Sequence, residues 1–294
     1  MITAPLLASL ALAMAPPVVQ DPVTDLSDVV VLGSRRDEAA AERFVSGVAA
    51  PPFGVSGLAI WDRPICLVVD NLRPATASAI RDRVAQRARS VGVEMADGDC
   101  RMNVLVVATA DGRMTARSLV EEDIGAFRPA GELTNLDQRA LRRFTDGDDP
   151  VRWWTVSLPV DVFTRRPLVA RRGSSQPVQR KTPAYAYWGG SIRQVMASVV
   201  VVIDASKTGE TPLEALADYI AFVVLAQVDA TSTFDDSATI LNLFRGGPSA
   251  AELTAWDQAY LTALYETPVT WTSVSRHRRE IARRMITGTS DRAD

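Results

Sequence analysis

Apolar positions along the chain form two patterns, short uninterrupted runs and runs at helical spacing. The uninterrupted runs predict strands buried in a sheet. They lie at residues 65–69, 103–109, 152–160 and 197–203. Between the first two runs, Pro74 begins a stretch to Ser90 with apolar residues on one face and arginines on the other, which predicts an amphipathic helix. This order favours a parallel strand–helix–strand crossover, with a hairpin as the alternative.

A longer apolar stretch at residues 213–228 predicts a central helix that is buried nearly all round. Thr211, Pro212 and Glu214 fit a capping box with proline at the first helical position. The pattern as a whole predicts a mixed sheet packed against this helix, in either the α/β or the α+β class.

Two further signatures mark helix starts. Thr134, with Asp137 three residues later, predicts an N-cap and a short helix. Thr254 and Asp257 repeat the pattern ahead of apolar residues at helical spacing, and a final basic amphipathic helix is expected at residues 274–285.

The N-terminal segment has the features of a secretory leader. Its apolar run at residues 6–14 is shorter than the roughly 20 residues that span a bilayer. Ala11 and Ala13 fit signal-peptidase cleavage after Ala13. No lysine or arginine precedes the run, so a core or interfacial segment stays open as the alternative. We expect a periplasmic or secreted chain, with no lipoprotein anchor and no membrane span in its mature part.

Four segments are predicted along the chain. They are a signal peptide at 1–13, an N-terminal segment at 14–50, a globular α/β domain at 51–286 and a polar tail at 287–294. The N-terminal segment is expected to hold a linker, a short strand at residues 29–32 and a helix at residues 37–48. A division of the globular domain into two parts near residue 150 is the alternative.

The two cysteines, Cys66 and Cys100, adjoin the first two predicted strands. An even count in an exported chain favours one disulfide. On the chain-entropy account such a bond would contribute roughly 3–4 kcal/mol. Two buried free thiols are the alternative.

Histidine is nearly absent, since His277 is the only one in 294 residues. Zinc hydrolases need two or three imidazoles, and Ser-His-Asp or Cys-His catalysis needs one beside the nucleophile. No cofactor or metal site is predicted. The arginines on both sides of His277 predict a solvated position with a lowered pKa. Nucleic acid is not an expected partner, because the chain is predicted to be exported and its net charge is −3.

Asp218 is the carboxylate of most interest, because it lies in the apolar central helix. A structural interpretation pairs it with an arginine or places it at a solvent edge, and a functional one makes it an acid or base with a raised pKa. Adjacent acidic residues elsewhere, such as Asp148 and Asp149, are expected to be solvated. Trp153 and Trp154 should point to opposite faces of their strand.

A basic loop follows the third predicted strand. It contains no acidic residue and is edged by aromatic residues, so it suits an anionic partner such as lipid headgroups, polysaccharide or a protein surface. A flexible solvated loop is the alternative. The residues of this basic loop that we consider as contacts are Arg165, Arg166, Arg171, Arg172, Arg180, Lys181, Tyr185 and Trp188.

The C-terminal third resembles a group of uncharacterised exported bacterial proteins that are distantly similar to metzincin-like zinc peptidases. The motifs that carry the resemblance lie at residues 217–220, 238–244, 253–257 and 260–265. The resemblance implies a peptidase-like scaffold over about residues 45–270. If Asp218 takes the place of the catalytic glutamate of His-Glu-x-x-His, Ala217 and Ala221 stand where the histidines belong, and alanine cannot bind zinc.

These features favour an exported, non-enzymatic protein that binds another envelope component, on a degenerate peptidase-like scaffold. One alternative is a hydrolase that uses carboxylates alone, with Asp218 as its acid or base. Another is a structural accessory subunit that docks its apolar helix on a partner.

Overall fold

The computed structural model describes residues 26–129, 136–169, 192–245, 247–268 and 273–290, and residues from Asp37 onward form one compact unit. The elements in chain order are α1 (Leu26–Val48), β1 (Leu67–Asp70), α2 (Pro74–Ser90), β2 (Val104–Thr109), α3 (Gly112–Glu122), α4 (Ile124–Phe127), α5 (Gln138–Asp146), β3 (Val151–Asp161), β4 (Ile192–Asp204), α6 (Leu213–Leu225), the 3-10 turn η2 (Ile240–Asn242), α7 (Ala255–Glu266) and α8 (Val274–Ser290).

The four strands form one mixed sheet in the order β1-β2-β4-β3. β1, β2 and β4 run parallel, and β3 pairs with β4 in the antiparallel sense at the edge of the sheet. The mixed α/β class is therefore confirmed, and β1, α2 and β2 form the parallel crossover rather than a hairpin. Because strands from both halves of the chain share this sheet, the domain does not divide near residue 150.

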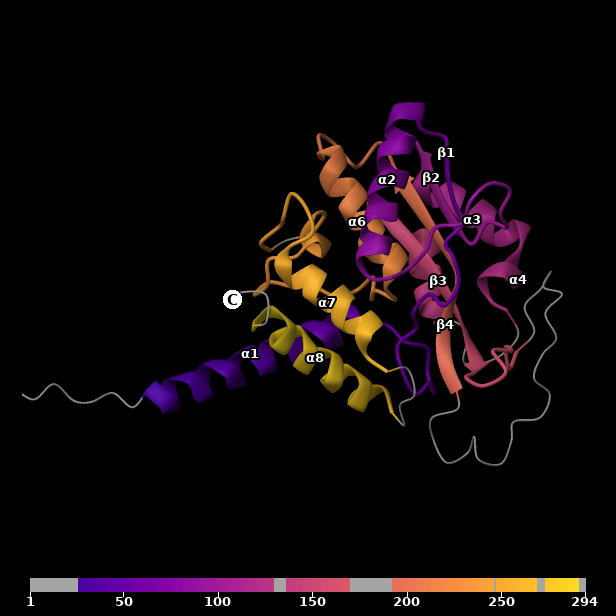
Figure 1. Ribbon diagram of the computed structural model, residues 1–294. Coiled ribbons are helices and arrows are strands. Elements are labelled where there is room, and N and C mark those ends of the chain that lie inside the picture. Colours follow the sequence, from indigo (N-terminus) through magenta and orange to yellow (C-terminus); the bar gives the residue numbers. More distant parts are fainter. Residues whose placement is uncertain (1–25, 130–135, 170–191, 246, 269–272, 291–294) are drawn as a thin grey trace, which may run out of the picture. The chain divides into compact units, whose positions relative to one another are not determined.

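Helices cover both faces of the sheet (Figure 1). α2 and α6 lie side by side on one face, and α3 and α4 lie on the other. The first face joins α6 and α7 in the larger apolar core, where residues 217–225 of α6 are all buried. The predicted central helix is thus confirmed as the middle of this core, although it ends at Leu225 rather than residue 228.

Trp153 and Trp154 point to opposite faces of β3, as the strand alternation predicts. Trp153 belongs to the larger core and donates its indole N–H to the carbonyl oxygen of Val228 at 3.1 Å. Trp154 belongs to the smaller core under α3, α4 and α5, and donates to the carbonyl oxygen of Phe127 at 2.8 Å. Both rings therefore pack inside, each with its polar N–H satisfied.

One of the two capping boxes forms. At α7 the Thr254 hydroxyl accepts the Asp257 N–H at 3.0 Å, and the Asp257 carboxylate accepts the Thr254 N–H at 3.0 Å. At α6 Pro212 is the N-cap and no side chain caps the helix, because the Thr211 hydroxyl donates to the Thr208 carbonyl instead. The capping box predicted for α6 was wrong.

The start of α5 also differs from the prediction. Asp137 is its N-cap and accepts the Ala140 N–H at 2.9 Å, so this residue is not at the third helical position. Thr134, the predicted cap, lies outside the described residues. A carboxylate is as good an N-cap acceptor as a hydroxyl, so the pattern alone does not choose between the two residues.

The strand predicted at residues 29–32 was wrong, since α1 is helical through them and continues to Val48. The expected helix at residues 37–48 is present as its C-terminal half. Extending an existing helix adds one hydrogen bond for each residue fixed, so a short β-branched run without a proline can be absorbed into it. Among the residues that the structure describes, no helix is long and apolar enough to cross a membrane.

Candidate functional site

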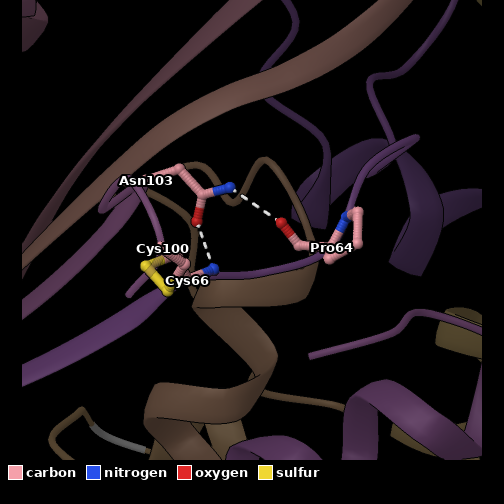
Figure 2. The surroundings of a disulfide bond; sticks show 4 residues. All are labelled: Pro64, Cys66, Cys100 and Asn103. Carbon is pink, nitrogen blue, oxygen red and sulfur yellow. Dashed lines mark hydrogen bonds between the residues drawn. A yellow bond between two sulfur atoms is a disulfide. The ribbon is translucent and has the colours of Figure 1, made fainter. Parts of the chain in front are cut away.

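A disulfide joins the start of β1 to the segment before β2 (Figure 2). Cys66 and Cys100 are bonded with an S–S distance of 2.04 Å, which confirms the predicted pair. Beside it, the Asn103 side chain accepts the Cys66 N–H at 2.8 Å and donates to the Pro64 carbonyl oxygen at 3.0 Å. Asn103 therefore fixes where β2 begins relative to β1.

An apolar groove, here called the α3–sheet groove, begins beside Asn103 and has a volume of about 240 Å³. Sheet residues form its floor, and α3 and α4 form its wall. The lining residues are Met102, Asn103, Leu105, Leu119, Glu122, Asp123, Ala126, Phe127, Trp154, Val156, Ser198, Val199 and Val200. An apolar concavity with few polar groups is the usual form of a binding site.

The groove lies where the short helices α3 and α4 leave the sheet incompletely covered. Trp154 forms a fixed wall, because its indole N–H is bonded to the Phe127 carbonyl in α4. Met102, an apolar residue of the lining, stays 47 % exposed to solvent. This part of the surface consequently offers apolar area to a partner.

The rim of the groove is acidic. Glu122 ends α3, whose last turn holds no basic residue, and its side chain is exposed. Within the described ranges no lysine or arginine makes an ion pair with Glu122. Asp123 caps α4 by accepting the Ala126 N–H at 3.2 Å. The dipole of α3 disfavours the Glu122 carboxylate at its C-terminus, so a cation bound beside Glu122 would be stabilising.

Asp218 is fully buried and held by arginine. Arg87 donates two hydrogen bonds of 2.8 Å to its carboxylate oxygens, and Arg83 lies at 3.7 Å. The Leu253 N–H donates a third hydrogen bond of 2.9 Å. These contacts satisfy both oxygens and tie α2, α6 and the start of α7 together, which favours the structural interpretation over acid or base chemistry.

His277 does not have the solvated position predicted for it. Its side chain is fully buried, and its Nδ1 accepts the Leu58 N–H at 3.0 Å. Burial lowers the pKa of His277 to about 4, so the imidazole is neutral at pH 7. The prediction was wrong because adjacent residues of a helix point in different directions, so the exposure of the flanking arginines says nothing about position 277. His277 lies on the inward face of α8 together with Ile281, one turn later.

Asp257 is a second buried carboxylate with a structural role. It accepts hydrogen bonds from the Thr239 hydroxyl, from the Ile240 N–H at 2.9 Å and from the N-terminus of α7. Burial raises the pKa of Asp257, and these hydrogen bonds oppose that shift. Asp257 thus joins η2 to α7.

The basic loop falls mostly outside the described residues. Arg165 and Arg166 are described and are exposed, beside Phe163, which is 69 % exposed. Arg171, Arg172, Arg180, Lys181, Tyr185 and Trp188 lie beyond the part of the chain that is described. Of the acidic pairs, Asp148 is engaged on the surface by Lys207 at 2.7 Å and Arg113 at 3.2 Å.

Compared with known proteins, the chain matches no family model, no curated protein and no solved structure at a significant level. Among the described residues, no three His, Cys, Asp or Glu side chains are grouped so that they could hold a metal ion. The α3–sheet groove is the candidate functional site that the geometry supports best. Sequence reasoning missed it, because its lining comes from five separate elements.

Proposed function

We propose that the protein is an exported, non-enzymatic binding protein that receives an apolar side chain of an envelope protein in the α3–sheet groove, beside a basic residue of that partner. The observation that carries the proposal is the apolar lining of the groove together with the exposed Glu122 at its rim, which makes no ion pair with the described residues. The disulfide supports the exported location, because such bonds persist in oxidising compartments.

Apolar burial supplies the affinity in this proposal. Removing one leucine or phenylalanine side chain from water contributes about 1.5–3 kcal/mol, and the groove has the volume for such a group. A basic neighbour on the partner would meet Glu122, which adds specificity and association rate more than affinity.

The buried polar groups support the non-enzymatic part. Asp218, Asp257 and His277 are each occupied by hydrogen bonds that join elements of the fold. The degenerate peptidase-like scaffold remains part of the proposal, with α6 in the place of the helix that carries the zinc ligands and Ala217 and Ala221 at the histidine positions.

The basic loop is proposed as a second contact with the partner, supported by the exposure of Arg165 and Arg166. Replacing both arginines with alanine tests this contact separately. Unchanged binding of the partner in that variant would remove the loop from the proposal and leave the groove untouched.

The decisive experiment compares two positions on α3. A photo-cross-linking amino acid replaces Leu119, which lines the groove, or Met114, which is exposed on the same helix but does not line it. We expect one envelope protein to be captured in cells from position 119 and not from position 114. Capture should be lost when Ala126→Trp fills the groove and should weaken about tenfold in Glu122→Lys. Equal capture from both positions, or capture that survives Ala126→Trp, would overturn the proposal.

A further inference from the structure

Helices cover only part of the sheet face that carries the α3–sheet groove. On this face α3 packs on β2 and β4, and α4 and α5 pack on β3. α2 covers β1 on the opposite face. Because side chains alternate along a strand, Val69 of β1 points toward α2, and Val68 points to the groove side. Val68 is 39 % exposed there.

Val68 extends the floor of the groove to the edge of the sheet. It is the ladder partner of Leu105 in β2, and Leu105 is the partner of Val200 in β4. Leu105 and Val200 are half-buried and line the groove, as does the exposed Met102. Val68, Leu105 and Val200 consequently form one apolar row across three strands.

The uncovered width of this face matches one further helix. Neighbouring strands lie about 4.8 Å apart, and packed helices lie about 8–10 Å apart. A helix placed beside α3, which packs on β2 and β4, would therefore lie over β1. Its apolar residues, three and four positions apart, would contact Val68 and Leu105 and enter the groove beside Leu119 of α3.

The edge of β1 is less suited to an added strand. Alternate residues of a strand bond to opposite neighbours, so the main-chain groups of Ile65 and Val69 point away from β2. The Ile65 N–H and carbonyl are bonded to the Glu94 carbonyl at 2.9 Å and the Ala96 N–H at 2.8 Å. Arg81 of α2 donates to the Val69 carbonyl at 3.3 Å. These contacts occupy much of a short edge, which disfavours strand addition.

Charges around the uncovered face favour a basic partner. Glu122 lies at the rim of the groove, and Asp70, which shares the face of Val68, is exposed at the end of β1. Asp99 is exposed beside the disulfide, where Arg101 offsets part of the negative charge. Two copies of the chain that met through this face would bring two acidic rims together, which disfavours a homodimer.

We propose that the partner segment is a basic amphipathic helix that lies beside α3 over β1 and packs its apolar side on Val68, on Leu105 and in the groove. This inference rests on the proposed function, because it specifies the segment whose apolar side chain enters the groove. Helices bound in this way present apolar residues at positions i, i+3, i+4 and i+7. Basic residues of the helix would meet Glu122 and Asp70.

The test uses the full disulfide-bonded chain and two fluorescein-labelled peptides of identical composition, built from leucine, lysine, alanine and glutamine. Each has about 18 residues, because shorter isolated helices are marginal in water. One peptide places its leucines at helical spacing, and the other alternates them with polar residues. We expect saturable binding of the helical peptide, measured by fluorescence anisotropy, and at least tenfold weaker binding of the alternating peptide.

Matched variants locate the bound helix. Val68→Lys places a like charge beneath the peptide and should weaken binding about tenfold. Met114→Lys makes the same change in charge at an exposed position of α3 outside the groove and should change binding less than about twofold. If Val68→Lys does not fold, Val68→Thr, which keeps a β-branched side chain, replaces it and should weaken binding a few fold.

Three outcomes would overturn the helix inference: neither peptide binds, the alternating peptide binds as tightly as the helical one, or the variants at positions 68 and 114 bind alike. The cross-linking experiment from Leu119 keeps this failure separate from that of the proposed function. Capture that Ala126→Trp abolishes but Val68→Lys leaves intact would retain the groove and exclude the helix over β1. Specific binding of the helical peptide without any capture in cells would retain the helix site and exclude the envelope partner.

Discussion

Arg87 holds Asp218 through two hydrogen bonds of 2.8 Å that join their side chains across 131 positions of the sequence. This pair ties α2 to α6 in the larger core, and the Leu253 N–H extends it toward α7. Asp218, the buried carboxylate of the most apolar helix, is thereby a structural contact between three parts of the chain. The free energy of unfolding that is lost when Asp218 is replaced distinguishes this structural role from a catalytic one.

Replacing Asp218 with asparagine should destabilise the protein by about 3 kcal/mol, because it leaves Arg87 partly buried without its counter-ion. Urea unfolding followed by circular dichroism measures the loss. Glu214→Gln on the exposed face of the same helix is the matched control and should change stability by less than about 0.5 kcal/mol. A stable Asp218→Asn protein would mean that the ion pair is not structural and would reopen the acid–base alternative.

The buried imidazole of His277 should make stability depend on pH. Its folded pKa of about 4 lies below the ordinary value of 6.5, so between these values the unfolded chain binds more protons than the folded one. Stability is then fully present above pH 6.5 and falls as the pH drops toward 4, by up to about 3 kcal/mol.

Two measurements check this pH dependence. Because the chain has a single histidine, its imidazole resonances can be followed by NMR without assignment, and they should titrate near pH 4. His277→Asn keeps an acceptor for the Leu58 N–H, so its stability should lose the part of the pH slope that belongs to the imidazole. An imidazole that titrates near 6.5 would show that His277 is solvated after all.

Local patterns predicted two kinds of element: those that are buried on all sides, and those whose buried residues recur at helical spacing. The four strands and α6 are apolar enough to be recognised alone, and α2 alternates arginines with the buried Ile80 and Val84. α3 was not predicted, because its buried residues after Gly112 are only Ala116 and Val120. Two small apolar residues are too few to mark an amphipathic helix without the sheet on which it packs.

The groove could not be predicted from local patterns, and the burial of His277 was missed although the sequence held a signal for it. Met102 and Val200 meet in one groove although nearly a hundred residues separate them, and no local pattern encodes that meeting. For His277, the charge of adjacent residues gives no information on which helix face is covered. Spacing to Ile281 and Met285 was the available signal, since all three share one face of α8.

The two threonines at predicted capping boxes should respond differently to substitution. Thr254→Ala removes an acceptor for the Asp257 N–H and should lower the free energy of unfolding by about 1–2 kcal/mol. Thr211→Ala should change it by less than about 0.5 kcal/mol, because Thr211 does not cap α6. Urea midpoints of the two variants provide the comparison. Equal losses would show that the α6 box forms in solution.

The disulfide should stabilise both the fold and the α3–sheet groove. Cys66 and Cys100 are 34 positions apart, so replacing both with serine should lower the free energy of unfolding by roughly 3–4 kcal/mol on the chain-entropy account.

Asn103 lies between the disulfide and the groove. The variant Asn103→Ala removes the hydrogen bonds of this side chain to Cys66 and Pro64 and leaves the disulfide intact, so it measures the contribution of Asn103 alone. We expect Asn103→Ala to cost about 1–3 kcal/mol and to weaken partner capture from position 119, whereas Ser90→Ala on the exposed end of α2 should do neither. Full partner capture by a folded Asn103→Ala protein would show that the hydrogen bonds of Asn103 beside the disulfide do not stabilise the groove.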